Sequence, residues 1–119
     1  MTQGYLTTHV LDTASGQPAG GMAISLYRLE GENRTKLAQV STNTDGRTDT
    51  PILPKGECVP GTYELVFETG AYLDRIGVPA EEPRFLDHIP IRFGISDKEA
   101  HYHVPLLLSP FGFSTYRGS

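Results

Sequence analysis

The chain has 119 residues, a length that fits one domain with a single modest core. Its 10 Lys and Arg residues stand against 14 Asp and Glu residues, which gives a formal net charge of −4 without a basic cluster. This balance excludes the basic footprint of a nucleic-acid-binding protein. The 13 Gly and 9 Pro residues favour many short elements over a helical bundle. We therefore expect one domain over residues 1–119.

Cysteine usage and the first residues bear on the cellular compartment. Cys58 is the only cysteine, so an intrachain disulfide cannot form, which is typical of an intracellular protein. The opening residues, MTQGYLTTHV, show neither the charged region nor the apolar region of a secretory signal. The longest apolar run, Val104 to Leu108, is far too short to span a bilayer. The sequence predicts a cytoplasmic protein without membrane contact.

Most of the chain predicts short strands separated by turn residues, because apolar and polar side chains alternate over short runs. One helix is expected over Gly70 to Ile76, ended by Gly77 and Pro79. The expected strands run over Leu6–Asp12, Met22–Leu29, Thr35–Thr42, Thr62–Thr69, His88–Ile95, His101–Leu108 and Phe111–Tyr116, with a short strand beginning at Arg47 after the turn signal Asn43-Thr44-Asp45-Gly46. About eight strands and one helix indicate an all-β antiparallel sandwich.

Two prolines interrupt otherwise regular strand patterns. Pro90 lies within His88–Ile95 and Pro105 within His101–Leu108. Proline lacks the backbone donor of a sheet ladder, so it is normally confined to edge strands or bulges. We expect local irregularities at both positions.

The C-terminal stretch His101–Ser119 is the most informative part of the sequence. Side chains alternate along a strand, so His101 and His103 share one face with Pro105 and Leu107. The even positions from Tyr102 to Leu108 are apolar or aromatic and should face a core. Chain ends are usually frayed. A polar ending of Tyr-Arg-Gly-Ser directly after a strand suggests a terminus that is held in place for a purpose.

Single residues do not define an activity at this level. His9 and His103 could each be ordinary strand histidines, and Arg47 could be a solvent-facing turn residue. His101 and His103 could also form a metal half-site, with His9 as a third zinc ligand. No cysteine or obvious carboxylate near them completes a set of four ligands.

Three motifs together resemble the transthyretin-like 5-hydroxyisourate hydrolase family, over essentially the whole chain. The residues that carry the resemblance are His9-Val10-Leu11-Asp12 near the start, Asp45-Gly46-Arg47 in the middle, and the stretch from His101-Tyr102-His103 through to the closing Tyr116-Arg117-Gly118-Ser119. The resemblance implies a transthyretin (prealbumin)-like sandwich of two four-stranded, antiparallel-type sheets with one short helix. It also implies a homotetramer, a dimer of dimers, with sites in a channel where the dimers meet.

The resemblance further implies an enzyme of urate (purine) degradation that hydrolyses 5-hydroxyisourate to its ring-opened carboxylate without a cofactor or a metal. Carried over residue by residue, it assigns a catalytic role to His9, Arg47, His103 and Ser119, and a substrate-binding role to His9, Arg47, Tyr116, Arg117 and Gly118. His101 is typical of the family too, in a supporting role. The alternative is a non-catalytic transthyretin-like carrier, which would need an apolar lining for a small hydrophobic ligand.

The chemistry explains why these residue types suit the reaction. Water is a poor nucleophile near neutral pH, so a neutral imidazole is needed to take its proton as it adds to the cyclic amide carbonyl. A fixed guanidinium such as that of Arg47 can stabilise the negative charge that develops on oxygen. The second imidazole can orient the first or protonate the leaving nitrogen. The sequence leaves open whether His9 or His103 is the general base.

Overall fold

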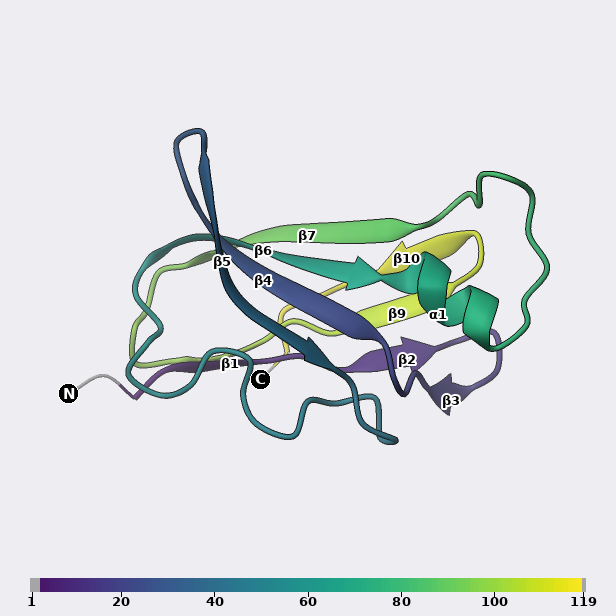
Figure 1. Cartoon of the computed structure of the whole chain (residues 1–119). Helices are drawn as coiled ribbons and strands as arrows, with labels where there is room; N and C mark the ends of the chain where they lie inside the picture. Colours follow the sequence, from purple (N-terminus) through teal and green to yellow (C-terminus); the bar gives the residue numbers. More distant parts are fainter. Residues whose placement is uncertain (1–2, 119) are drawn as a thin grey trace.

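The computed structural model describes residues 3–118, and its strands form two layers packed face to face (Figure 1). One layer is a four-stranded antiparallel sheet in the order β5-β4-β6-β7. Its strands are β4 (Ala23–Glu30), β5 (Asn33–Ser41), β6 (Gly61–Glu68) and β7 (His88–Ile95). The predicted strands of this layer agree with these within two residues at each end.

The second layer is built from the two ends of the described chain. Its strands are β1 (Tyr5–Thr7), β2 (Val10–Asp12), β3 (Gln17–Pro18), β8 (His101–His103), β9 (Leu106–Ser109) and β10 (Gly112–Ser114). Four of them form a sheet in the order β10-β9-β2-β3, while β1 pairs with β8. The β1–β8 and β2–β9 pairs are parallel, and the β9–β10 and β2–β3 pairs are antiparallel. The predicted sandwich is thus confirmed, with two parallel pairs inside this layer.

The predicted strands Leu6–Asp12 and His101–Leu108 are each interrupted once. The interruptions fall at Thr8-His9 and Val104-Pro105, and Pro105 lacks a backbone N–H. Backbone hydrogen bonds still cross this region, from Val104 N–H to the carbonyl of Thr7 (3.0 Å) and from Leu106 N–H to the carbonyl of His9 (2.8 Å). The side chains of both segments therefore form one continuous surface. Pro90 lies on β7, an edge strand of the other sheet, as the rule for proline requires.

The core lies between the layers and is filled by the faces that alternation predicts. In the first layer Ile24, Leu26 and Phe67 are fully buried, and in the second Leu106 and Leu108 are. Burial of such side chains contributes roughly 1.5–3 kcal/mol each to folding. Leu37 on β5 does not join the core and is 42% exposed. A register shift opposite Leu26 and Tyr27 leaves Leu37 without a direct partner on β4, which breaks the alternation.

A short helix, α1 (Thr69–Arg75), covers one end of the sandwich, one residue before the predicted range. So short a helix is unstable in isolation and depends on its buried side chains, which include Tyr72 and Leu73. The Tyr72 hydroxyl donates a hydrogen bond to the buried carboxylate of Asp12 on β2 (2.9 Å). Burial and this carboxylate raise the pKa of Tyr72 to about 12. The bond therefore ties the helix to the second layer at any physiological pH.

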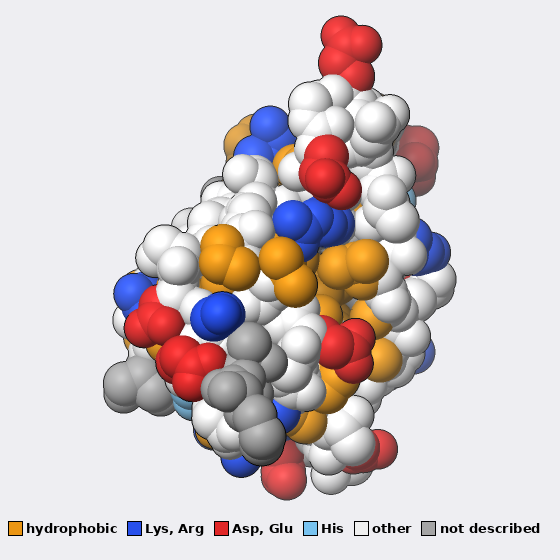
Figure 2. All heavy atoms as spheres, turned by 90° about the vertical axis from the view of Figure 1, so that its left-hand side faces the viewer, with side chains coloured by type: hydrophobic (Ala, Val, Ile, Leu, Met, Phe, Trp, Pro, Cys, Tyr) orange, Lys and Arg blue, Asp and Glu red, His pale blue; other side chains and the backbone are white. Residues whose placement is uncertain are grey.

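Figure 2 shows the end opposite α1, where apolar side chains gather in the middle of the face with charged side chains around them. Large apolar side chains are also exposed elsewhere, notably Phe85, Phe111 and Tyr116. Among residues 3–118, none of the helical structure is long and apolar enough to cross a membrane.

Candidate active site

The outer face of the second layer carries the predicted site histidines, His9 and His103, together with His101. The parallel register places Tyr5 opposite His101 and Thr7 opposite His103, with all four side chains half-buried on the face away from the core. His9 follows on the same face, two residues after Thr7. The alternation that buries the even positions thus gathers imidazoles from the two ends of the chain on one surface.

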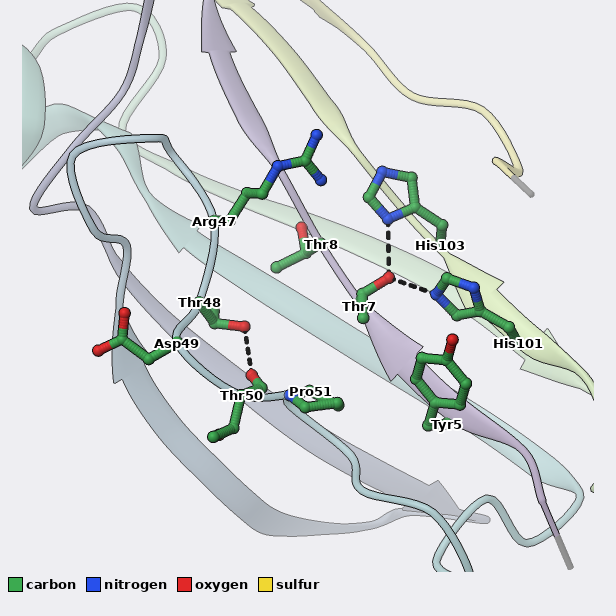
Figure 3. A pocket seen from close by; sticks show the side chains of 10 residues that line it. All are labelled: Tyr5, Thr7, Thr8, Arg47, Thr48, Asp49, Thr50, Pro51, His101 and His103. Atoms are coloured by element: carbon green, nitrogen blue, oxygen red, sulfur yellow. Dashed lines mark hydrogen bonds between the residues drawn. The ribbon is translucent and has the colours of Figure 1, made fainter.

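A cavity of about 400 Å³ opens on this surface (Figure 3). Most of the residues that line it have polar side chains, and they come from β1 and the residue after it, from β8 and from the loop after Gly46: Tyr5, Thr7, Thr8, Arg47, Thr48, Asp49, Thr50, Pro51, His101 and His103. In Figure 3 the Arg47 side chain extends from its loop toward the strand that carries His103. His9 does not line this cavity, but its backbone pairs directly with that of Arg47.

The turn predicted at Asn43–Gly46 positions Arg47. The Asn43 side-chain oxygen accepts hydrogen bonds from the backbone N–H groups of Asp45 (2.9 Å) and Arg47 (3.2 Å). Gly46 has φ +75° and lies so close to the carbonyl of Val10 that a Cβ atom would clash with it. The Val10 N–H donates to the Gly46 carbonyl (2.8 Å), which fixes the turn against β2. Glycine is therefore required immediately before Arg47.

The His9 imidazole has a defined proton arrangement. Its Nε2 lies 3.0 Å from the carbonyl oxygen of Asp45, and a carbonyl can only accept. The neutral ring therefore carries its hydrogen on Nε2 and leaves the lone pair on Nδ1. Burial, followed by the charge of Arg47, lowers the pKa of His9 below its usual 6.5. His9 is therefore neutral near pH 7, the state that a general base requires.

The His103 imidazole is neutral for similar reasons. Burial is the largest cause that lowers its pKa below 6.5, followed by the charges of Arg47, His101 and His9. Its Nδ1 lies 2.8 Å from the Thr7 hydroxyl, which also lies 2.6 Å from His101 Nε2. His103 lines the same cavity as Arg47, whose backbone pairs with that of His9, so the three residues belong to one surface.

The C-terminal segment approaches His103 from the other side. Gly118 pairs with His103, and its N–H donates to the His103 carbonyl (2.7 Å). Tyr116, which is 57% exposed, and Arg117 line a different hollow, next to Phe93 and Tyr102. The Arg117 guanidinium lies 4.3 Å from the centre of the Tyr102 ring. Ser119, the last predicted site residue, lies outside the described residues.

Sequence reasoning missed Thr7, Tyr5 and the loop residues Thr48–Pro51. Alternation along the predicted strand Leu6–Asp12 places Thr7 on the same face as His9, which is a usable signal. What it could not supply is the parallel register that sets Thr7 opposite His103, since pairing between distant strands is not encoded locally. Within residues 3–118 the structure contains no group of three or more His, Cys, Asp or Glu side chains arranged to hold a metal ion.

The arrangement can support general acid–base chemistry on a small polar molecule. Two neutral imidazoles can take or give a proton, and the guanidinium can bind an oxygen that becomes negatively charged. The carboxylate of Asp49 and the threonine hydroxyls add hydrogen-bonding groups at the cavity wall.

Comparison with known proteins agrees with this architecture. The chain is 58% identical over 116 residues to "5-hydroxyisourate hydrolase 2" of Rhizobium meliloti (strain 1021), covering 98% of this chain and 97% of that protein. The solved structure of Klebsiella pneumoniae 5-hydroxyisourate hydrolase is 39% identical with a TM-score of 0.80, covering 97% of this chain and 99% of the other.

A further solved structure, that of an (S)-allantoin synthase, superimposes with a TM-score of 0.94 at 49% identity. The match covers 99% of this chain but only 44% of the synthase, so the present chain spans less than half of that protein. The family description "HIUase/Transthyretin family" matches residues 6–118. The chain therefore belongs to the HIUase/Transthyretin family.

Proposed function

We propose that the protein is a hydrolase that opens the ring of 5-hydroxyisourate by addition of water to a cyclic amide carbonyl. The observation that carries the proposal is the gathering of two neutral imidazoles, His9 and His103, with the Arg47 guanidinium on one outer face. The high identity over nearly full length to a relative named for this activity supports the same substrate.

The contacts suggest separate roles for the three side chains. The Nδ1 lone pair of His9 and the Nε2 atom of His103 are the two nitrogens that remain after the bonds to Asp45 and Thr7. One of them takes a proton from water and the other orients the substrate or protonates the leaving nitrogen. Arg47 binds the carbonyl oxygen and stabilises its negative charge in the tetrahedral intermediate. No cofactor or metal enters this proposal.

The proposal extends to the C-terminal tail and to the assembly. Gly118 next to His103 brings the tail to the edge of the site, where Ser119 would act as a catalytic group and Tyr116 and Arg117 would help bind substrate. We propose a homotetramer, a dimer of dimers, as the active form of this single-domain, cytoplasmic chain. Its support is the edge position of β10 and the exposure of Phe113 (45%) on this strand and of Phe111 (74%) just before it.

The carrier hypothesis required an apolar lining, and the cavity beside the histidines does not have one. Arg47, Asp49 and two imidazoles line it together with four threonines. Burying a small hydrophobic ligand against these groups would remove them from water without compensating hydrogen bonds. The hydrolase is therefore the function that this site favours.

One assay tests the function directly. Fresh 5-hydroxyisourate is generated from urate with urate oxidase, and its ultraviolet decay is followed with and without the protein. We expect decay much faster than the spontaneous rate, in proportion to the protein concentration, and no acceleration with a His9→Ala, His103→Ala double variant. A decay rate that the wild-type protein leaves unchanged would overturn the proposal.

A further inference from the structure

The Thr7 hydroxyl lies between two imidazoles in the wall of the cavity (Figure 3). It is 2.6 Å from His101 Nε2 and 2.8 Å from His103 Nδ1. The parallel register sets Thr7 directly opposite His103, so the contact follows from strand pairing. The His101 ring is held from its other side by Tyr5, whose ring stacks on it at 4.1 Å with an interplanar angle of 9°.

The number of hydrogens restricts how these three groups can bond. A hydroxyl donates one hydrogen and accepts through its lone pairs, and a neutral imidazole has one N–H and one lone pair. Thr7 has one hydroxyl hydrogen, which it can donate to only one of the two rings. If both short contacts are hydrogen bonds and one uses this hydrogen, the other ring must donate its own N–H to the Thr7 oxygen. The proton positions of His101 and His103 are therefore coupled through a single oxygen.

The charge of Arg47 selects between the two possible directions. If Thr7 donated to His103 Nδ1, the His103 hydrogen would sit on Nε2, the nitrogen that points away from Thr7 in Figure 3. Arg47 lines the same cavity as His103, and after burial its charge is the next largest cause that lowers the pKa of His103. A nearby cation favours a lone pair over an N–H group on the nitrogen that faces the cavity. The favoured direction runs from His103 Nδ1–H to Thr7, and from the Thr7 hydroxyl to His101 Nε2.

We propose that Thr7 is a positioning residue that holds His103 in the Nδ1–H tautomer, with His101 as the acceptor of the Thr7 hydrogen. This inference rests on the proposed hydrolase function. It deepens that function by leaving the lone pair of a general base on His103 Nε2, the nitrogen that does not contact Thr7. His101 thereby gains a role that does not require contact with the substrate.

The contrast with His9 makes the inference specific. A backbone carbonyl fixes the tautomer of His9, and no side-chain substitution removes that acceptor. The tautomer of His103 depends on one hydroxyl that Thr7→Val deletes with almost no change in shape. Thr7→Ser keeps the hydroxyl and should keep the tautomer. Thr13→Val is a matched control, because it removes a threonine hydroxyl bond to the Leu108 carbonyl at the far end of the same layer.

The direct readout is nitrogen NMR of labelled histidine at about pH 8, where an imidazole with its usual pKa is neutral. The His103 signal is identified as the one missing from His103→Gln. We expect a protonated Nδ1 and an unprotonated Nε2 in the wild type and in Thr7→Ser. In Thr7→Val we expect a shift toward the Nε2–H form. A wild-type spectrum with the hydrogen on Nε2, or a spectrum unchanged in Thr7→Val, would overturn the inference.

Kinetics give the second readout. Thr7→Val should lower kcat by about 10- to 100-fold, the range for groups that orient a functional imidazole. KM should change little, because the Thr7 hydroxyl is occupied by the imidazoles. Thr7→Ser should restore most of kcat, and Thr13→Val should match the wild type. Equal kcat in Thr7→Val and the wild type would count against the role of Thr7.

The two proposals fail in different ways. A wild-type protein that does not accelerate hydroxyisourate decay defeats the hydrolase, while the NMR measurement still decides the tautomer. If Thr7→Val does not fold, circular dichroism will show it, and the wild-type spectrum alone still confirms or overturns the assignment of the His103 hydrogen.

Discussion

The two edges that flank the histidine face are built in different ways. On one side Arg47 pairs with His9 on the first segment of the layer, and on the other Gly118 pairs with His103 on the partner segment. Both are single antiparallel bridges. The Arg47 edge is held by a turn with its own network of short-range hydrogen bonds around Asn43. The tail edge is held by contacts with residues about ten or more positions earlier in the chain.

Those tail contacts are few. The Thr115 hydroxyl donates to the Pro105 carbonyl (2.7 Å), Gly118 N–H donates to the His103 carbonyl, and Arg117 lies over the Tyr102 ring. A local turn folds with little loss of chain entropy, whereas each long-range contact must also order the segment it holds. Arg47 is therefore presented by a turn that forms locally, whereas the tail depends on the strand that it covers.

The largest effect should come from His103, which pairs with Gly118 of the tail and lines the same cavity as Arg47. His103→Ala removes the proposed base or its partner, and we expect kcat to fall by about 100-fold or more, the usual range for general acid–base groups. His88→Ala is the matched control, since it removes an exposed strand histidine on the other sheet. Steady-state decay kinetics of hydroxyisourate measure both. Comparable kcat values for the two variants would remove His103 from the mechanism.

A substitution of Arg47 should lower activity without destabilising the turn that carries it. Arg47→Lys keeps the positive charge but loses the planar fork that can hold two acceptors. We expect kcat/KM to fall by roughly 30- to 100-fold, toward the lower end of what removal of an oxyanion donor costs. Thermal unfolding should be unchanged, because the turn is fixed through backbone groups. Activity close to that of the wild type would show that charge alone suffices.

Gly118→Ala adds one methyl group and should disturb the packing of the tail on His103. A Cβ atom on Gly118 would lie 2.6 Å from His103 Cδ2, closer than real Cβ contacts allow, so the ring or the tail must shift. Misplacing a catalytic group by such an amount can cost up to about 100-fold in rate, and we expect about 10-fold for Gly118→Ala. Gly112→Ala is the control, because its nearest neighbour, Ser109 Oγ, would be 3.6 Å away. Similar rates for both variants would contradict the close packing of the tail on His103.

The same contrast explains how far sequence reasoning reaches. The turn before Arg47 was predicted because Asn-Thr-Asp-Gly encodes it locally, and the faces of the strands were predicted because alternation encodes them. The expected neighbourhood of His9 and His103 came from family resemblance. The parallel register that makes it possible, and that brings Thr7 between two imidazoles, is a long-range property. For the same reason the separation of Tyr116 and Arg117 from the histidine cavity could not be predicted.

The pH dependence of kcat/KM should respond to a change at the Arg47 edge and not to one at the tail edge. Burial and then Arg47 lower the pKa values of His9 and His103 below 6.5, so both imidazoles, the base among them, remain neutral to a lower pH than ordinary histidines. We expect kcat/KM to be constant above neutrality and to fall on the acid side with an apparent pKa below 6.5. Arg47→Met should raise that apparent pKa, because it removes the nearby cation while Asp45, His101 and His9 remain. An acid limb unaffected by Arg47→Met would contradict the electrostatic coupling.

Arg117→Met should have the smallest effect and defines what the tail contact contributes. Methionine keeps the apolar stem but loses the cation over the Tyr102 ring, an interaction worth about 0.5–1 kcal/mol at an exposed site. Since Gly118 N–H still bonds to His103, we expect the tail to stay in place most of the time and kcat/KM to fall by about 2- to 5-fold. The acid limb of the pH profile should not move, in contrast to Arg47→Met. A loss of kcat/KM as large as that expected for Gly118→Ala would instead mean that Arg117 contacts the substrate, as the family resemblance implies. The tail edge would then contribute binding groups as directly as the Arg47 edge does.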